Sequence, residues 1–408
     1  MQPFLTEENL KWKSLAHQVA EEVVRPVAKK YDELQEYPWE IKKALADAGL
    51  MGVWIPKEYG GHGGGVLDLC VCVEELSRAC GGVGVLYAVN ALGSFPILLS
   101  GTEEQKKAIL PAIASGEKLI SFALSEKFAG SDAGSMYMRA EKKGSEYILS
   151  GEKKWNTNGE VADYYTVFAV TDPTSRSRRI SAFVVEKGTP GCTIGKVEDK
   201  MGIRCVPVVE LLFDDCRVPE TALLGGKEGH GFKDAMMTLD RARPGVAAQG
   251  VGLAQGALEL AIVYANKRHM FGAPVSSHQM VQKMLADMSA KVEAARQIVY
   301  ASGRAIDLGM PKVSKLAAQA KCFATDVAME VTTDAVQIFG GYGYMKDYPI
   351  EKYMRDAKIT QIYEGTNQVQ RMVIARHLVK EAAEYSYLER FIPKEEQKGY
   401  EPPQPEGK

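Results

Sequence analysis

The stretch Tyr147-Ile148-Leu149-Ser150-Gly151-Glu152-Lys153-Lys154-Trp155 has the alternating pattern of a β-strand and breaks at Asn158-Gly159. Alternation with a period of two is typical of a strand that buries one face. Further β-rich runs, separated by Asp-Pro, Thr-Pro-Gly and Asp-Asp turns, cover residues 164–171, 180–186 and 209–213. Many short strands at this spacing predict a sheet sandwich or a barrel between about residues 122 and 224.

Upstream of this region the apolar residues follow the spacing of helices. Leu15, Val19 and Val23 recur four residues apart, which places them on one helix face. Thr102 stands where its hydroxyl can cap a helix that opens with Glu103. The chain from about residue 6 to residue 121 is therefore predicted to be helical.

Downstream, from residue 231 onward, the pattern predicts long helices. Ser276 and Ser277 are expected to cap one of them, and Gly340-Gly341 is expected to end another. Long helices joined by short loops predict a helical bundle. We therefore expect an α+β multidomain chain with an N-terminal helical domain over 1–121, a β-sheet or barrel-like domain over 122–232, a C-terminal four-helix bundle over 233–385, and a flexible tail over 386–408.

The composition excludes several classes of function. A net charge of -2 over 408 residues leaves no basic excess for binding nucleic acid. The seven cysteines and six histidines are dispersed and follow no metal-binding spacing, so no metal site is predicted and the thiols are expected to be reduced. No signal or transit pattern is found at the start, and no apolar run is expected to reach membrane-spanning length. These features predict a cytoplasmic, bacterial protein.

Glu364 is the strongest catalytic candidate in the chain. It lies in the segment Ile362-Tyr363-Glu364-Gly365-Thr366-Asn367-Gln368, between a charged stretch and a strongly helical run. A carboxylate in a glycine-containing bend can be aimed by the backbone, as a base needs when it takes a proton from a carbon acid. A solvated loop tip, or a carboxylate at a helix N-terminus, explains this segment alone equally well.

Two segments of the strand region could hold a cofactor. Phe122-Ala123-Leu124-Ser125-Glu126-Lys127-Phe128-Ala129-Gly130-Ser131-Asp132-Ala133-Gly134 offers hydroxyls, small residues and free backbone N–H groups near a strand end. Trp155-Asn156-Thr157-Asn158-Gly159 follows a strand, and its indole could stack on a flat ring that the Thr hydroxyl also contacts. A plain turn and a core Trp before a hairpin are the respective alternatives.

Two segments of the helical region could approach a ligand. Arg268-His269-Met270-Phe271-Gly272 joins two helices, where Arg could neutralise pyrophosphate and Phe could pack on a ring, although a solvated loop Arg explains it equally well. Gln337-Ile338-Phe339-Gly340-Gly341-Tyr342-Gly343-Tyr344 ends a helix in glycines that let the backbone approach a ligand. The second segment lacks the preceding strand of a Rossmann fingerprint.

Taken together, five separated motifs resemble the acyl-CoA dehydrogenase family, and most closely its short- and medium-chain or glutaryl type. The motifs are FALSEKFAGSDAG, WNTNG, RARPGVAAQGVGLAQGALELA, KRHMFG with QIFGGYGY, and QIYEGTNQVQRMVIARHL. They occur in the family's order within residues 6–380. The resemblance implies FAD as cofactor, a homotetramer built as a dimer of dimers, and electron-transferring flavoprotein as electron acceptor.

The resemblance also implies roles for individual residues. Glu364 falls on the family's catalytic base, and the alternative position before the RPG segment is Ala242 in this chain. The residues implied to bind FAD are Phe122, Leu124, Ser125, Ser131, Trp155, Thr157, Arg268, Phe271, Gln337, Gly341, Thr366 and Gln368. Those implied to lie near acyl-CoA are Ser131, Asp240, Arg243, Tyr363 and Gly365. Of the FAD residues, Arg268, Phe271, Gln337 and Gly341 are implied to hold the ADP half of a FAD bound mainly by a neighbouring subunit.

Some positions depart from the family pattern. Glu126-Lys127-Phe128 replaces the usual Glu-Pro, which puts the shape of this loop in question. Met270 stands where a hydroxyl is common, so one flavin hydrogen bond is expected to be lost. Gly84 takes the place of the Arg that grips a distal carboxylate in the glutaryl type, so that grip is not expected. The tail beyond Lys380 is longer than usual.

The function implied by the resemblance is α,β-dehydrogenation of an acyl-CoA thioester, with Glu364 removing the α-proton while a β-hydride passes to flavin N5. The thioester oxygen is expected to accept hydrogen bonds from the Glu364 backbone N–H and a flavin ribityl hydroxyl. A flavin oxidase or monooxygenase on the same scaffold, and a non-catalytic scaffold that binds FAD or acyl-CoA, are the alternatives.

The acyl group is expected to meet a pocket floor formed by two helices. One surrounds Asp240, and the other contains Leu86, Tyr87, Ala88 and Asn90. Small residues of that second helix could make room for a branched, alicyclic or aromatic acyl group. They are Gly81, Gly82, Gly84 and Ala88.

Overall fold

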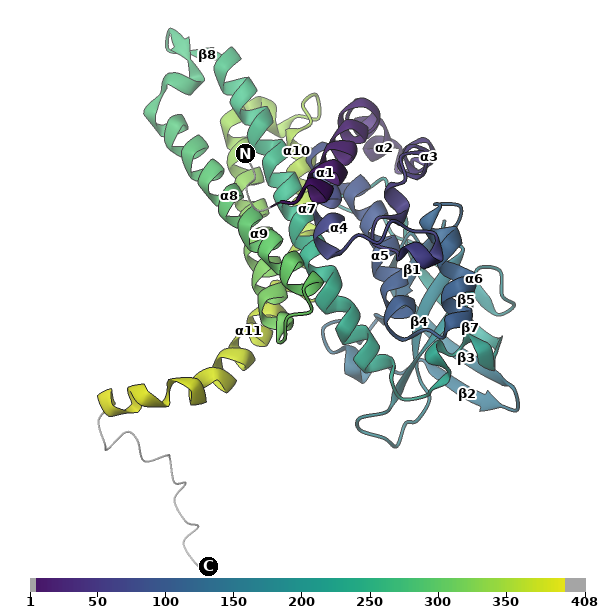
Figure 1. Cartoon of the computed structure of the whole chain (residues 1–408). Coiled ribbons are helices and arrows are strands. Elements are labelled where there is room, and N and C mark those ends of the chain that lie inside the picture. The colour runs from purple at the N-terminus through teal and green to yellow at the C-terminus, as the bar shows by residue number, and fades with distance from the viewer. Residues whose placement is uncertain (1–4, 393–408) are drawn as a thin grey trace, which may run out of the picture.

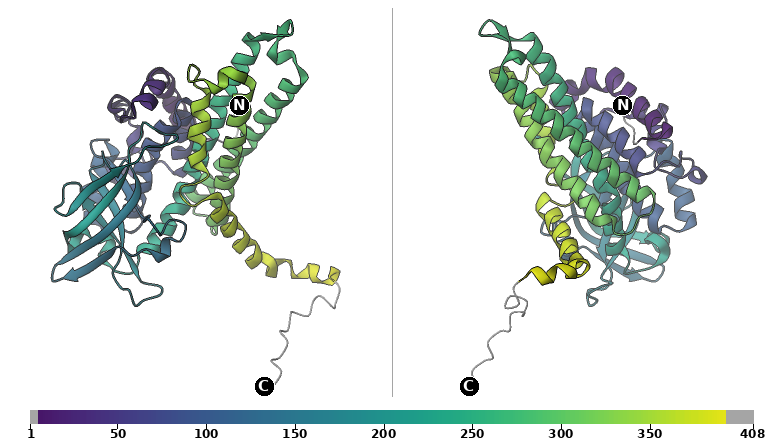
Figure 2. Two further views of the ribbon diagram at one scale, coloured as in Figure 1. Left: turned by 180° about the vertical axis from the view of Figure 1, so that it is seen from behind. Right: turned by 60° about the vertical axis from the view of Figure 1, so that its left-hand side comes forward.

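The structure, a computed structural model, describes residues 5–392 as a helical N-terminal part, a curled sheet and a helical C-terminal part (Figures 1 and 2). The expected α+β order of helical, β and helical regions is confirmed. The expected domain limits at residues 121, 232 and 385 stay predictions. Residues 1–4 and 393–408 lie outside the described part of the chain, and the latter include most of the tail that we expect to be flexible.

The N-terminal part is built around two almost completely buried helices, α4 and α5. Thr102 caps the last helix of this part as predicted, because its hydroxyl accepts a hydrogen bond from the backbone N–H of Gln105 at 3.3 Å. The helices are α1 (Glu7–Val19), α2 (Ala28–Leu34), α3 (Trp39–Asp47), α4 (Val66–Ala79), α5 (Gly81–Ser100) and α6 (Glu103–Ala114).

The predicted β region is a seven-stranded curled sheet. Its order is β1-β4-β2-β3-β7-β6, and β5 pairs with β4; the β1–β4 contact is parallel and the β3–β7 contact antiparallel. The register of β3 against β7 shifts between Lys153 and Asn156, so the strand is irregular where Trp155 lies. The strands are β1 (Ile120–Ala123), β2 (Arg139–Lys143), β3 (Glu146–Thr157), β4 (Tyr164–Val170), β5 (Ile180–Glu186), β6 (Cys192–Val197) and β7 (Val208–Pro219).

The C-terminal part consists of three long helices and two shorter ones. Glycines allow α7 to approach its neighbours closely, since a Cβ on Gly252 would lie 2.2 Å from the carbonyl oxygen of Glu74 in α4. The helices are α7 (Gly231–Lys267), α8 (Gln279–Asp307), α9 (Val313–Phe339), α10 (Ile350–Thr360) and α11 (Asn367–Glu381), and strands β8 (His269–Met270) and β9 (Ala273–Pro274) join α7 to α8. In both figures α11 and the following 3-10 segment Ala382–Phe391 project away from the body.

The ends of the long helices test two sequence predictions. The predicted stop after α9 is confirmed, because Gly340 follows Phe339 with a φ of 61°. The predicted caps of α8 are wrong: Ser276 and Ser277 lie in a 3-10 turn, and His278 takes the position before the helix. The Ser277 hydroxyl bonds back to the carbonyl oxygen of Pro274 at 2.7 Å instead of capping α8.

Two helices, α5 and α7, are long and apolar enough to cross a membrane, which corrects the expectation that no apolar run reaches that length. Most of each apolar window lies inside the protein, 78% for α5 and 72% for α7. Core helices pass the same test of length and composition, so this is weak support for a membrane span.

Candidate active site

Glu364 lies in the tight bend that joins α10 to α11. Its φ is 52° and that of Gly365 is 89°, so two successive residues adopt the left-handed conformation. A non-glycine residue rarely does so, and such backbone strain gathers at functional sites. Thr366 then starts α11, its hydroxyl accepting a hydrogen bond from the Val369 N–H at 3.2 Å. The backbone, held at both ends, therefore directs the carboxylate.

The Glu364 carboxylate is enclosed but incompletely bonded. The residue is half-buried, while its Oε2 has no solvent exposure and no hydrogen-bond partner among the described residues. Burial raises the pKa of Glu364 to about 7, against the smaller opposing effects of Lys321 and Arg243. A carboxylate with this pKa is poised to act as a base near neutral pH.

Lys321 of α9 approaches the same bend and was missed by the sequence analysis. Its side chain has no solvent exposure, and its Nζ donates to the Gly365 carbonyl oxygen and to Asn367 Oδ1, both at 2.9 Å. Burial lowers the pKa of Lys321 to about 8, although Glu364 opposes this shift. A signal existed in the sequence, because Lys321 shares one helix face with alanines at positions 317, 324 and 328.

Arg243 of α7 acts electrostatically on Glu364, and Asp240 of the same helix pairs with Arg243. Arg243 is buried and its Nη1 donates to Asp240 Oδ1 at 2.7 Å. The Ser314 hydroxyl also donates to Asp240. Burial lowers the pKa of Arg243, while Asp240 and Glu364 act in the opposite direction. The structure thus brings the two predicted residues of α7 close to the predicted base.

Tyr363 ties the bend to the core. Its hydroxyl donates to the side-chain oxygen of Gln249 in α7. The other end of the Gln249 amide donates to the carbonyl oxygen of Gly81 at 3.0 Å, which is the first residue of α5. The Gln249 amide of α7 therefore links α5 to the bend that carries Glu364.

The glycines of α5 named in that hypothesis make no room for a wide acyl group, which corrects this part of it. The contribution of Ala88 stays a prediction. A Cβ on Gly82 would lie 2.5 Å from the Cys205 sulfur, and one on Gly84 would lie 1.9 Å from the Ser77 hydroxyl oxygen. The space beside them is therefore filled by other elements.

The loops of the sheet that were predicted to hold a flavin lie side by side. Phe122 is near the end of β1, and the Ser125 carbonyl oxygen accepts a hydrogen bond from the Lys154 N–H at 2.9 Å. Trp155 follows with a φ of 58° and 51% of its surface exposed, so a core Trp is the wrong reading. Thr157 is half-buried at the end of β3. An exposed, backbone-strained indole beside main-chain groups suits a flat ligand.

A buried ion pair supports this loop, and the sequence analysis missed it. Lys153 and Glu126 both have side chains with no solvent exposure, and their charged groups lie 2.7 Å apart. Lys153 also donates to the Leu124 carbonyl oxygen at 3.1 Å. The backbone N–H groups of Tyr137 and Met138 donate to the Glu126 carboxylate at 2.7 and 3.0 Å. The pair thereby fixes Leu124, which was predicted to bind FAD.

The residues predicted to hold an ADP group gather elsewhere. The Arg268 guanidinium carbon lies 5.3 Å from the centre of the Tyr342 ring, which brings the β8–β9 turn next to the end of α9. Phe271, at the tip of this turn, is 94% exposed, and Gln337 and Gly341 are exposed too. Figures 1 and 2 place the turn at one end of the bundle, away from the sheet. One chain therefore does not bring these four residues to the loops that were predicted to hold a flavin.

The remaining predicted contacts are also accessible. Ser131 is exposed in the segment between β1 and β2, and Gln368 is exposed in the first turn of α11. Gln368 and Thr366 line a hollow of about 320 Å³ between α9, the end of α10 and the start of α11. A ligand could therefore reach Ser131, Thr366 and Gln368.

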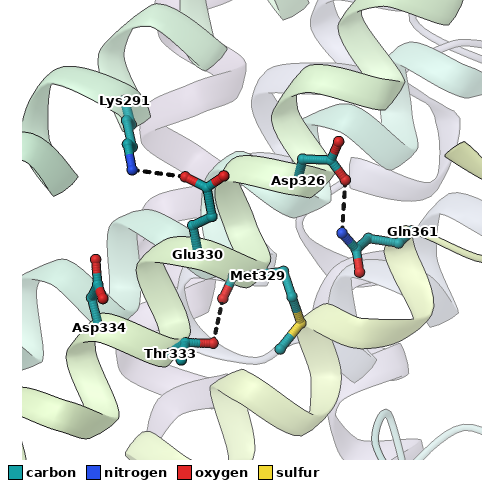
Figure 3. Close-up of a pocket in the computed structure, with 7 residues that line it drawn as sticks. All are labelled: Lys291, Asp326, Met329, Glu330, Thr333, Asp334 and Gln361. Carbon is teal, nitrogen blue, oxygen red and sulfur yellow. Dashed lines mark hydrogen bonds and ion pairs between the residues drawn. The ribbon is translucent and has the colours of Figure 1, made fainter. Parts of the chain in front are cut away.

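A larger hollow of about 700 Å³ lies beside it along α9 (Figure 3). It is crossed by two polar contacts: Lys291 meets Glu330 at 2.7 Å, and the Gln361 amide donates to Asp326 at 2.7 Å. Its lining residues are Lys291, Asp326, Met329, Glu330, Thr333, Asp334 and Gln361. None of these residues was predicted to form the site.

Comparison with known proteins first defines the class. Family models of the acyl-CoA dehydrogenase N-terminal, middle and C-terminal domains match residues 6–117, 121–216 and 229–379. These three domains, matched in this order, define an oxidoreductase acting on acyl-CoA. The chain belongs to the acyl-CoA dehydrogenase family.

Relatives of known description cover nearly the whole chain. A probable acyl-CoA dehydrogenase of Mycobacterium tuberculosis is 49% identical over 376 residues, which are 92% of this chain and 96% of the relative. Butyryl-CoA dehydrogenase from Megasphaera elsdenii is 45% identical with a TM-score of 0.90, covering 92% of this chain and 99% of that structure. A chain in a structure described as electron transferring flavoprotein of Acidaminococcus fermentans is 50% identical with a TM-score of 0.90, covering 92% and 98%.

Proposed function

We propose that this acyl-CoA dehydrogenase uses FAD and that Glu364 is the base that removes the α-proton of the thioester, giving the 2-enoyl-CoA. The observation that carries this proposal is the buried Glu364 carboxylate, whose Oε2 has no partner among residues 5–392 and whose pKa is about 7. A structural carboxylate would be bonded, since buried polar groups normally are.

The backbone of the same residue supplies a second group for the reaction. The N–H of Glu364 finds no acceptor within the described part of the chain. It is free to donate to the thioester oxygen, which becomes more negative as the α-proton leaves. The α-proton is a weak acid, so this stabilisation of the enolate is needed for a carboxylate of pKa about 7 to remove it.

The loops of the sheet fit the flat part of FAD. The carbonyl oxygens of Leu124 and Ser125 accept hydrogen bonds from Lys153 and Lys154, which directly precede the exposed Trp155. Thr157 is within the same strand. Bound FAD would supply the acceptor of the β-hydride at N5. These residues would hold the ring in place and exclude water from one side, while Phe122 lines the adjacent strand end. Ser131 would contact either the flavin pyrophosphate or the CoA chain.

The separation of the ADP residues supports a multimeric enzyme. Arg268 and Phe271 are exposed at the end of the bundle, away from the sheet of their own chain. We infer a homotetramer, built as a dimer of dimers, in which Arg268, Phe271, Gln337 and Gly341 complete the FAD site of a neighbouring chain. Thr366 and Gln368 would contact the same cofactor after the base, and Asp240, Arg243, Tyr363 and Gly365 would lie around the acyl-CoA.

Electron-transferring flavoprotein is the acceptor that we propose, in a cytoplasmic setting. The 50% identical chain from Acidaminococcus fermentans belongs to a structure described by that electron carrier, which supports the choice. An oxidase on the same scaffold would instead pass its electrons to dioxygen. Dioxygen consumption without an added acceptor distinguishes the two.

The Glu364→Gln variant tests the proposed base. We expect it to keep FAD and lose flavin reduction by about 100- to 10,000-fold, the usual contribution of a positioned base. The measurement is anaerobic bleaching of the visible flavin band by straight, branched, cyclic and dicarboxylic acyl-CoAs. Bleaching of the variant at a near-normal rate would remove Glu364 from the mechanism, and a colourless wild-type protein would favour the non-catalytic scaffold.

A further inference from the structure

We propose that Lys321 is a positioning residue that fixes the bend carrying Glu364 and supplies the positive charge against which this base ionises. The inference rests on the proposed function, because it assigns Lys321 a task for the base named there. It adds a residue of α9 that contacts neither the substrate nor the cofactor in the mechanism above.

Lys321 is bound to the bend but leaves the base free. Its Nζ donates at 2.9 Å to the carbonyl oxygen of Gly365, the residue after the base, and it makes no hydrogen bond to the Glu364 carboxylate. A direct ion pair would occupy an oxygen that must accept the α-proton. A cation held one residue away stabilises the charged carboxylate through space and leaves that oxygen available.

The bend is fixed by several contacts of the same kind. The Gln370 amide donates to the carbonyl oxygens of Glu364 and Gly365 at 3.2 and 2.9 Å, so the Gly365 oxygen accepts from two side chains. Asn367, which accepts from Lys321, donates to the Thr325 hydroxyl of α9 at 2.9 Å. Left-handed backbone at a glutamate persists only when its surroundings hold it. Among the side chains that hold the bend, Lys321 is the charged one.

The charges around the base single out Lys321. The groups that face Glu364 are Lys321 from α9, Arg243 from α7 and Tyr363 from its own loop. Arg243 is already paired with Asp240 at 2.7 Å, which offsets its positive charge. The two hydrogen-bond acceptors of Lys321 are both neutral. Its charge is therefore less compensated than that of Arg243.

The carboxylate nearest to Lys321 on its own helix is engaged elsewhere. Asp326 of α9 acts on Lys321, as does the thiol of Cys322. Asp326, however, pairs with Arg371 at 2.6 Å and accepts from Asn367 and Gln361 at 2.7 Å. Glu364 thus remains the principal negative partner of the Lys321 charge.

The test is the pH dependence of stability, which needs no turnover. We would measure the thermal unfolding temperature of the holoenzyme and of Glu364→Gln across pH, first with Lys321 and then with Lys321→Met. The difference between each pair reports the titration of Glu364, together with the change that its charge makes to the Lys321 pKa wherever Lys321 is present. With Lys321 present the difference in unfolding temperature should level off near pH 7, and with Lys321→Met it should level off at least about one pH unit higher. We call the pH at which the difference levels off the Glu364 midpoint.

Two further variants keep the result decisive. Lys315→Met, which removes a cation of the same helix that pairs with Glu381 at 2.6 Å, should leave the midpoint where it is. Lys321→Arg keeps the charge and should preserve the midpoint, while flavin reduction slows because the larger group fits the Gly365 oxygen less well. An unchanged midpoint in Lys321→Met, or an equal shift in Lys315→Met, would overturn the proposal.

The stability titration also separates this inference from the proposed function. If no acyl-CoA reduces the flavin, the proposed function fails while the shift of the Glu364 midpoint can still be read. If the flavin is reduced, the rate of reduction should follow the same midpoints. Should Lys321→Met not fold, Lys321→Gln gives the same neutral comparison, and failure of both neutral variants with a folded Lys321→Arg would itself show that the charge is needed.

Discussion

Two glutamates with enclosed carboxylate oxygens, each near a buried lysine, behave differently in this protein. In the sheet, Glu126 accepts from Lys153 and from two backbone N–H groups, all within 3.0 Å. In the bundle, Glu364 leaves its Oε2 without a partner, and Lys321 binds the neighbouring backbone instead. Burial lowers the pKa of both lysines to about 8.

The difference shows how bonding separates a structural carboxylate from a reactive one. A fully bonded buried pair holds its loop, and breaking it leaves a charge uncompensated. A buried carboxylate with a free oxygen costs stability and keeps a raised pKa, which are the properties of a base. Burial alone would therefore not have distinguished Glu126 from Glu364.

The largest expected effect comes from breaking the fully bonded Glu126–Lys153 pair, which we call the closed pair. Lys153→Met should lower the free energy of unfolding by about 3–5 kcal/mol, because Glu126 would stay buried without its cation. FAD retention should fall as well, since the Leu124 carbonyl oxygen loses its donor. The measurement is thermal unfolding together with flavin content.

The neighbouring residue provides the control for this prediction. Lys154 pairs with Glu198 and Glu210, but its side chain keeps some contact with water. Lys154→Met should therefore lower the free energy of unfolding much less than Lys153→Met. Equal losses in both lysine variants would contradict a special role of the buried pair.

A smaller effect of opposite sign on the free energy of unfolding is expected at Glu364. The folded pKa of Glu364, about 7, lies above its ordinary value of 4.5, so the native state binds the proton more tightly. Stability contributed by the protonated form is complete below about pH 4.5 and is lost as the pH rises toward 7. Glu364→Gln should thus stabilise the substrate-free protein by about 3 kcal/mol at pH 8 and change little at pH 4.

Glu126→Gln is the matched comparison for this variant. It removes the charge that balances Lys153, so it should destabilise the protein at pH 8 instead of stabilising it. Unfolding temperatures of both variants at two pH values check the contrast. A Glu364→Gln protein that is less stable than the wild type at pH 8 would show that the base is satisfied by contacts other than those described.

The order of the elements was predictable because periodicity is local. The alternating run before Asn158 and the caps at Thr102 and Gly340 depend on residues close in sequence, and all three are confirmed. The predicted caps of α8 were wrong, although they too depended on nearby residues. Ser276 and Ser277 form a 3-10 turn, and the helix begins only after His278.

The contacts that distinguish the two glutamates were not predictable in this way. Lys153 reaches Glu126 across 27 residues, and Lys321 reaches Gly365 across 44. A single lysine in an apolar pattern gives no indication of its distant partner. The glycines of α5 misled for the same reason, since the groups that fill the space beside Gly82 and Gly84 come from other elements. Glu364 itself was found through a motif, whereas its free oxygen is a property of the fold.

The smallest expected effect lies beside the closed pair, at the position where the family usually has proline. Glu126 and Ala129 exchange two backbone hydrogen bonds of 3.1 Å, and Lys127 and Phe128 form the turn between them without positive φ. Proline suits the first of these two turn positions and is disfavoured at the second. Lys127 is exposed, so its side chain holds nothing in the core.

Lys127→Pro should therefore raise the free energy of unfolding by about 0.4–1 kcal/mol, because it restricts the unfolded chain without disturbing Glu126. Phe128→Pro should lower it and reduce flavin retention, and thermal unfolding of both variants is the measurement. If Lys127→Pro were as damaging as Phe128→Pro, the turn would be held by Lys127 and not by the buried carboxylate before it. A gain from Lys127→Pro would instead show that the Glu126–Lys153 pair fixes this loop strongly enough for the chain to dispense with the usual proline.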